Sequence, residues 1–157
     1  MQFQVEHIGS IGEDGRGFFV AVLPPYREAL TGLEDFGYLQ LLWWFDRCDN
    51  PQDRSRLMED KPYKKGPEKL GVFATRSPSR PNPIGVSVCY ATAVDKAQGL
   101  IRLAYIDAFP GTPVLDIKPY TPSLDRVDEP PVPKWCAHWP MSIEESEDFD
   151  WAAEFNF

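Results

Sequence analysis

Histidine and cysteine, which build many metal sites and nucleophilic active sites, are scarce in this chain of 157 residues. The three cysteines, Cys48, Cys89 and Cys136, are widely spaced and form no CxxC pair. This pattern argues against a disulfide framework and a structural zinc site, and it predicts idle thiols in a reducing cytoplasm. The two histidines, His7 and His138, define no metal-ligand spacing. No G-x-S-x-G motif supplies a nucleophile either, so we expect neither a metal centre nor a hydrolase triad.

Long apolar runs are absent as well. The longest one, YLQLLWWF at residues 38–45, is far too short to cross a bilayer. The opening residues, MQFQVEHIGSIGEDGRG, contain no basic region followed by an apolar stretch, so we expect no signal peptide. Together these absences predict a cytoplasmic protein.

A Rossmann-type glycine loop is also missing. The segment EDGRG at residues 13–17 superficially matches the acidic-x-G-x-G loop of Rossmann-type methyltransferases. That loop needs a strand before the glycines and a helix after them, whereas the strand-like FFVAVL follows here. We interpret EDGRG as a plain glycine turn.

Proline, in contrast, is abundant. The chain has 16 prolines, most of them between apolar runs, which favours short strands and shaped loops over a helical bundle. Apolar residues make up 43% and charged residues 25%, as in ordinary globular proteins. The length suits one domain with a sizeable core.

Short apolar segments between turn signals predict a mainly β fold. We expect the clearest hairpin where an alternating strand at 86–94 returns at 100–106. The S-x-x-E pair Ser142 and Glu145 predicts a short C-terminal helix that buries Phe149 and Trp151. The fold class is therefore all-β, a small closed or partly open barrel or a sandwich with a short C-terminal helix. The other strands are expected at 3–8, 18–23, 38–45 (buried on both faces) and 113–117, with a helical turn within 24–38 and a long loop at 48–69.

Charge is distributed unevenly along the chain. The net charge is −8, but residues 125–157 alone hold nine acidic and two basic residues. Residues 47–80 hold nine basic and five acidic ones. We expect a barrel domain at 1–125 and an acidic extension at 126–157 that packs on the barrel. The basic stretch either meets phosphate or is a solvated loop.

The segment TRSPSRPNPIG at residues 75–85 is the first candidate site. Its three prolines fix φ and push the preceding residues towards extended conformations, so its side chains are pre-organised. Arginine suits a carboxylate, a phosphate or a flat ring, and the Asn82 amide suits a nucleobase edge. The alternative is a structural loop whose arginines, Arg76 and Arg80, pair with Asp107 or Asp116.

A second stiff polar stretch, DAFPGTPVLDIKPYTP, follows at residues 107–122. It combines two aspartates with a lysine, a tyrosine and four more prolines. If the strands between the two stretches pair, both can line one cleft, which favours a functional site over a structural loop.

These two stretches resemble the TrmO (TsaA-like) family. GVFATRSPSRPNPIGVS and GTPVLDIKPYTP are similar to that family almost letter for letter, and GLEDFGYLQLLWWF resembles its GLE-x-F-S-H-L strand. The resemblance covers roughly residues 30–125. It implies a β-barrel that dimerises, binds S-adenosylmethionine outside any Rossmann fold, and methylates N6-threonylcarbamoyladenosine in tRNA.

The resemblance also implies which positions of this chain bind the cofactor and which shape the pocket. No catalytic base follows from it, and Asp116 and Tyr120 are candidates by residue type only. The implied cofactor-binding residues are Asp46, Arg47, Arg76, Val86, Ala104, Tyr105, Ile106 and Asp107. The implied pocket residues are Ser77, Arg80, Asn82, Asp116, Lys118 and Tyr120.

The chain departs from the family pattern in several places. Residues 9–17 are short and lack the family's cofactor motif, the family's histidine after the apolar strand is Asp46, and D-G-T-P reads P-G-T-P at 110–113. An acidic tail stands where some members carry a tRNA-binding domain. Two alternatives therefore accompany the tRNA methyltransferase: an enzyme with a small-molecule acceptor, and a non-catalytic S-adenosylmethionine sensor.

Overall fold

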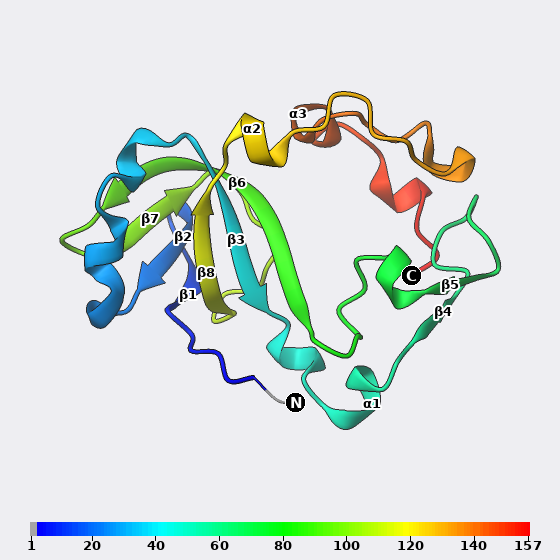
Figure 1. The fold of residues 1–157 in the computed structure, drawn as a ribbon, viewed down its shortest axis with the longest axis horizontal. Coiled ribbons are helices and arrows are strands. Elements are labelled where there is room, and N and C mark those ends of the chain that lie inside the picture. Colours follow the sequence, from blue (N-terminus) through cyan, green and yellow to red (C-terminus); the bar gives the residue numbers. More distant parts are fainter. Residues whose placement is uncertain (1–2) are drawn as a thin grey trace.

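The computed structural model describes residues 3–157, which form three parts (Figure 1). A β-barrel occupies one end of the molecule. An arm of residues 49–83 leaves the barrel between two of its strands and returns to it. Residues 126–157, the C-terminal segment, run from the barrel to the arm, so that the C-terminus lies beside the arm (Figure 1).

Six antiparallel strands close the barrel in the order β1-β2-β7-β6-β3-β8. The mainly β fold expected from the sequence is therefore confirmed, and the sandwich alternative is wrong. Because every strand has two neighbours, the barrel has no open edge. The strands are β1 (Gly9–Asp14), β2 (Gly17–Val22), β3 (Tyr38–Trp44), β6 (Ile84–Asp95), β7 (Leu100–Leu103) and β8 (Pro113–Pro119).

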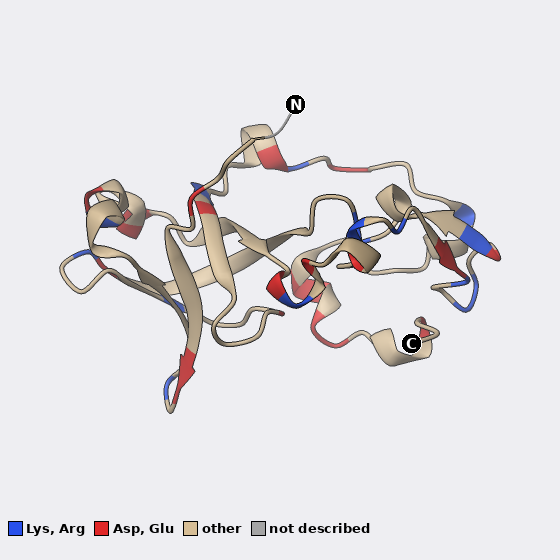
Figure 2. Cartoon of the chain, turned by 90° about the horizontal axis from the view of Figure 1, so that it is seen from below, with Lys and Arg blue, Asp and Glu red and all other residues tan. Residues whose placement is uncertain are grey.

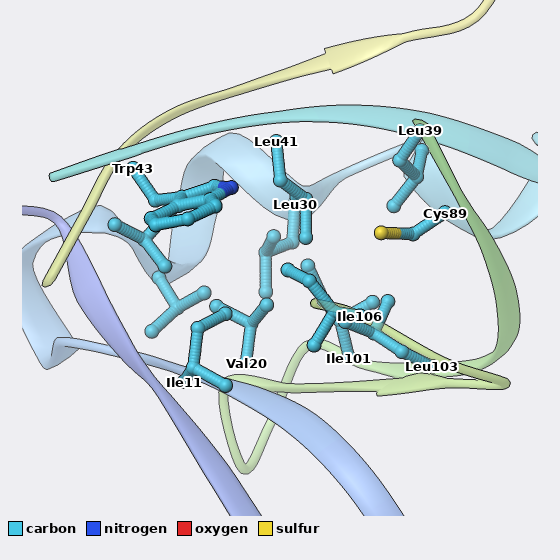
Figure 3. Close-up of a cluster of buried hydrophobic side chains, with 12 residues drawn as sticks. Ile11, Val20, Leu30, Leu39, Leu41, Trp43, Cys89, Ile101, Leu103 and Ile106 are labelled. Carbon is cyan, nitrogen blue, oxygen red and sulfur yellow. The ribbon is translucent and has the colours of Figure 1, made fainter. Parts of the chain in front are cut away.

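The core fills the inside of the barrel with side chains from every second position of the strands (Figure 3). On β3, Leu39, Leu41 and Trp43 are buried, while the residues between them are half-buried on the outer face. The expectation that this strand is buried on both faces was wrong, because a barrel covers only one face of each strand.

Two further expectations about the strands need correction. The first strand is Gly9–Asp14 and not residues 3–8, which carry no strand. β1 approaches β2 so closely that Gly9 has no room for a side chain: a Cβ on Gly9 would lie 2.4 Å from the Ala21 carbonyl oxygen. EDGRG is the end of the β1–β2 hairpin, with Asp14 opposite Gly17, as the glycine-turn interpretation predicts.

The expected 86–94 and 100–106 hairpin is present as β6 and β7, but β7 is shorter and a bulge at 91–93 shifts the register. The side chains of Val86, Val88 and Tyr90 face outward as one row, whereas Val94 beyond the bulge packs against the core. The strict alternation expected over the whole of β6 therefore stops at the bulge.

The arm contains more structure than the long loop expected at 48–69. The side chain of Asn50 caps a short helix, because its Oδ1 accepts from the Asp53 amide at 3.0 Å. A small two-stranded sheet extends the arm away from the barrel (Figure 1). The arm elements are α1 (Pro51–Arg54), β4 (Met58–Asp60), β5 (Lys69–Gly71) and the 3-10 helix η4 (Val72–Ala74).

The remaining helices are single turns. The capping box is present in part: the Ser142 hydroxyl accepts from the Glu145 amide at 3.2 Å, while the Glu145 carboxylate returns to the Met141 amide. No helix in the described part of the chain is long and apolar enough to span a membrane. These helices are η1 (Pro24–Leu30), η2 (Leu33–Asp35), η3 (Asp46–Cys48), α2 (Pro122–Asp125), η5 (Lys134–Cys136), α3 (Ile143–Ser146) and η6 (Trp151–Ala153).

Candidate functional site

Three segments meet at one end of the barrel: η3 after β3, the proline segment (residues 75–85) and the segment between β7 and β8. The Phe45 amide at the end of β3 donates to the Pro83 carbonyl at 2.8 Å, which holds the proline segment beside η3. The segment between β7 and β8 crosses the barrel end and brings Phe109 under the Arg47 guanidinium, 3.9 Å from its carbon to the ring centroid. Pairing of β3 with β6 and β8 produces this meeting point, whereas the sequence pointed to pairing of the strands between the two stretches, which are β6 and β7.

Residues 75–85 are held rigid by their own polar side chains. Arg80 donates from one nitrogen to the carbonyls of Val72 and Thr75, at 2.7 and 2.9 Å. The buried Ser79 hydroxyl donates to Asp53 at 2.6 Å and ties the segment to α1. The proline segment is therefore braced from within as well as stiffened by its prolines.

Arg76 is placed differently from Arg80. It is exposed, and its Nη1 donates to the Val86 carbonyl at 3.3 Å, so its remaining N–H groups face outward. Val86 itself lies on the outer row of β6 and is 43% exposed. Two implied cofactor residues from different segments are thus in direct contact.

The structural alternative for the two arginines is wrong in its details. Arg76 and Arg80 bond to backbone carbonyls and to neither Asp107 nor Asp116. Asp116 instead pairs with Lys118 at 2.7 Å, which raises the pKa of the lysine. Asp107 is exposed.

Residues 104–107, in the segment between β7 and β8, differ in how exposed they are. Ile106 is 2% exposed and belongs to the barrel core, so only its backbone can contact a ligand. The Ala104 amide is already used by the Tyr90 carbonyl at 3.0 Å. Tyr105 is exposed and packs edge-on against Phe18 at 5.8 Å.

Of the other implied residues, Asp46, Arg47, Ser77 and Asn82 lie on segments that meet here. Lys118 and Tyr120 lie towards the opposite end of β3, beside Gln40 and Tyr38. Asp46 and Arg47 are exposed on η3, directly after β3. Ser77 donates to Glu59 of β4 at 2.7 Å, and Asn82 is exposed, with its carbonyl accepting from Ile84. Asp116 and Lys118 lie opposite Leu42 and Gln40 on the outer face of the sheet, and the Tyr120 ring contacts Tyr38 at 6.3 Å.

Two candidate site residues, Phe109 and Glu59, were not predicted from the sequence. Phe109, 60% exposed, carries the Arg47 guanidinium on its face. Its only signal was an aromatic residue in the polar stretch that opens at Asp107. Glu59, which holds Ser77, has no sequence signal at all, because the arm sheet that places it was expected to be a loop.

The site offers the exposed guanidinium groups of Arg47 and Arg76 and the exposed carboxylates of Asp46 and Asp107. It also offers the outward apolar row of β6 that includes Val86. Such a set can bind a ligand with a carboxylate tail, hydroxyl groups and an aromatic base. No cluster of three or more metal-ligating side chains occurs within residues 3–157. The three cysteines are free, and burial raises the pKa of the Cys89 thiol to about 12, so that thiol is not a nucleophile.

Lysine and arginine positions mark the arm, at the end of the molecule away from the barrel (Figure 2). Each lysine of the arm has an acceptor. Lys61 pairs with Glu68 and Lys69 with Asp60, both within the arm. Lys64 donates to the Ala152 carbonyl and Lys65 to Glu154, both in the C-terminal segment. The arm is therefore a cationic surface whose lysines are partly engaged by the rest of the chain.

Comparison with known families identifies residues 9–126 with the model described as the tRNA-methyltransferase O N-terminal domain. The matched region contains the whole barrel and the arm, and it ends where the C-terminal segment begins.

Individual relatives agree with this match. A Pyrococcus abyssi protein named for S-adenosyl-L-methionine binding is 42% identical over 106 residues, 68% of this chain and 53% of the relative. A Pseudomonas aeruginosa protein named as a candidate S-adenosylmethionine-dependent methyltransferase is 44% identical over 108 residues, 68% of this chain and 45% of the relative. The chain thus spans about half the length of each of these two.

A solved structure shows the same fold. A crystal structure of TrmO from P. aeruginosa superposes with a TM-score of 0.64 and 32% identity, covering 83% of this chain and 60% of that one.

Proposed function

Since the chain belongs to the tRNA-methyltransferase O family, we propose that it is an S-adenosylmethionine-dependent methyltransferase acting on tRNA in the cytoplasm. The acceptor we propose is the N6 position of N6-threonylcarbamoyladenosine. The observation that supports the cofactor most directly is Arg76, exposed and oriented by the Val86 carbonyl beside the exposed face of β6.

The residues at this barrel end fit S-adenosylmethionine chemically. The cofactor carries a carboxylate, a sulfonium cation, two ribose hydroxyls and an adenine ring. Arg76 and Arg47 suit the carboxylate, the exposed Asp46 and Asp107 suit hydroxyls or the cation, and the outer face of Val86 suits the adenine ring.

When bound, the cofactor supplies the methyl group, and the protein's part is to position the acceptor and to accept one proton. The rigid proline segment places Arg76 and Asn82 with little entropy left to lose on binding. Asp116 pairs with Lys118 at 2.7 Å, which orients its carboxylate along the outer face of β8. Of the two candidates by residue type for the proton acceptor we retain Asp116, because Tyr120 lies beside Tyr38 at the far end of β3 from η3.

The arm supports tRNA as the partner. Residues 47–80 carry nine basic and five acidic residues, and they lead directly into the proline segment. Phosphate contacts from lysine and arginine supply most of the non-specific affinity for nucleic acid. The arm would hold the tRNA backbone while the barrel end holds the cofactor and the base.

We also propose that the protein is a homodimer. Ile84, Val86 and Tyr90 form one outward row on β6, and they are 37%, 43% and 48% exposed. Exposed apolar rows of this kind mark interaction surfaces. A second copy on this face would cover the apolar row beside Arg76 and enclose the bound cofactor.

One observation favours a small-molecule acceptor instead: the net charge is −8, and the lysines of the arm already have acceptors. Incubation with methyl-labelled S-adenosylmethionine, bulk tRNA and a tRNA-free small-molecule extract separates these functions. Label in tRNA alone supports our proposal, and label in the extract alone supports the small-molecule enzyme. Cofactor binding by calorimetry with label in neither supports the sensor.

A further inference from the structure

The C-terminal segment is bound to the tip of the arm by its backbone as well as its side chains. Tyr63 and Phe155 form an antiparallel β-bridge, and the Lys64 amide donates to the Glu154 carbonyl at 2.9 Å. The Asn156 side chain donates to the Lys61 carbonyl at 2.7 Å. The segment therefore docks in one defined register. We expected the segment to pack on the barrel, but these contacts go to the arm.

The buried Glu154 carboxylate lies at the centre of this contact. Glu154 is only 5% exposed, and its oxygens accept from Lys65 at 3.1 Å and from His138 at 2.9 Å. The Trp139 indole donates to the second oxygen at 3.2 Å. The Glu154 oxygen thus takes a position on Lys65 that a phosphate oxygen could take, since lysine binds both anions by charge-assisted hydrogen bonds.

The Trp135 ring of the C-terminal segment lies on Tyr63 of the arm. Trp135 stacks on Tyr63 with ring centroids 5.0 Å apart and an interplanar angle of 22°. Nucleobases stack on exposed tyrosines in the same way when proteins bind single-stranded RNA. Stacked ring and anion together reproduce the two contacts by which such RNA is held.

We propose that residues 61–65 of the arm are a single-stranded RNA contact, which the C-terminal segment occupies in competition with the RNA. This inference rests on the proposed tRNA substrate and identifies where part of that substrate binds. Tyr63 would stack a base, and Lys64 and Lys65 would contact the flanking phosphates. The C-terminal segment must leave this surface before the RNA can bind.

The segment's charge agrees with such a role. Residues 126–157 carry eight acidic and two basic residues, and the family model ends at residue 126. The barrel and arm match the family, whereas the competing segment lies almost wholly outside the match. Its release would expose lysines on the arm and move acidic side chains away from it.

The test uses the full-length chain with Glu154→Gln, which removes the anion and retains the residue's shape. Glu147→Gln is the matched control, because it makes the same charge change at an exposed position whose side chain has no hydrogen bond or ion pair with the rest of residues 3–157. Iodide quenching of tryptophan fluorescence reports release, since three of the five tryptophans (Trp135, Trp139 and Trp151) lie in the segment.

Binding of tRNA and of poly(U) is then measured against salt. We expect Glu154→Gln to expose the tryptophans and to bind both RNAs on the order of tenfold more tightly, with a salt slope steeper by about 1 to 2, from two lysines that each gain a phosphate. Glu147→Gln should match the wild type. If the segment stays docked in Glu154→Gln, the double variant Glu154→Gln/Trp139→Ala is tested, and we expect it to release the segment. A segment that stays docked in both variants overturns the inference.

The outcomes separate the inference from the proposed function. If the released variant binds poly(U) more tightly but no form transfers methyl groups to tRNA, the proposed RNA contact is supported and the proposed tRNA methyltransferase activity is contradicted. Methyl transfer to tRNA with unchanged RNA affinity after release retains the enzyme and overturns the competing segment. Weaker RNA binding after release also overturns it, because the segment would then support the arm.

Discussion

At the scale of single residues, the close contact between Gly85 and Trp43 connects the proline segment to the barrel core. A Cβ on Gly85 would lie 2.4 Å from the indole ring, which is held in place by a 3.0 Å hydrogen bond to Ser87 and by Phe45. Only glycine permits β6 to approach β3 so closely at the point where the site begins.

We therefore expect Gly85→Ala to displace the indole and destabilise the protein by about 1–3 kcal/mol, the usual cost of overpacking. Gly15→Ala is the matched control, because nothing lies within 4 Å of its Cβ. Urea unfolding measures both variants. Equal midpoints for the two would show that the contact between Gly85 and Trp43 is not tight in solution.

Arg76 provides the residue-scale test of the cofactor site. Arg76→Ala should weaken S-adenosylmethionine binding by about 1.5–3 kcal/mol, the typical contribution of a hydrogen bond to a charged group. Isothermal titration calorimetry gives the affinity. Arg126→Ala, an exposed arginine that follows α2 beyond the far end of β8, serves as the control. An Arg76→Ala affinity equal to the control's would remove Arg76 from the site.

At the scale of elements, the contact between the arm and the C-terminal segment depends on one carboxylate. The hydrogen bond from His138, with those from Trp139 and Lys65, lowers the pKa of Glu154 from 4.5 to about 2. A carboxyl whose pKa falls on docking favours the docked form above its free pKa and loses that contribution as the pH falls through the docked value.

Docking should therefore be fully favoured above about pH 4.5 and weaken progressively towards about pH 2. Iodide quenching of the segment's tryptophans at each pH measures this weakening. Glu154→Gln has no carboxyl at this position and should lack the acid-dependent step. Identical acid profiles for the variant and the wild type would mean that Glu154 does not hold the segment.

Local sequence signals predicted some elements well and others poorly. Ser142 and Glu145 located α3, and alternation located β6, because capping and strand periodicity are local properties. β1 was missed, since its glycines resemble a turn unless the neighbouring strand is known. The arm sheet of Met58–Asp60 and Lys69–Gly71 was missed too, because its strands are short and highly charged.

At the scale of the whole molecule, the barrel class followed from the sequence, whereas the position of β3 between the two proline-rich stretches did not. Pairing of β3 with β6 and β8 then brought Arg47 to Phe109 and Arg76 to Val86. Contacts between distant segments could not be predicted in the same way. The bond from Lys65 to Glu154 joins residues 89 positions apart, and no local pattern encodes that distance.

The proposed dimer is also a property of the whole molecule. Tyr90→Glu places a charge on the exposed row of β6 and should shift sedimentation from a dimer to a monomer, since burying an unpaired carboxylate is costly. Leu23→Glu, at a residue 37% exposed outside that row, is the control. A wild-type protein that sediments as a monomer at all concentrations would contradict the proposed dimer.

The most direct test of the central claim is methyl transfer from labelled S-adenosylmethionine to one purified tRNA, prepared with and without the threonylcarbamoyl group. We predict label only in the threonylcarbamoylated tRNA, at the modified adenosine, and none with Arg76→Ala at limiting cofactor. Equal label in both tRNAs, or none in either while the cofactor binds, would contradict the proposed function.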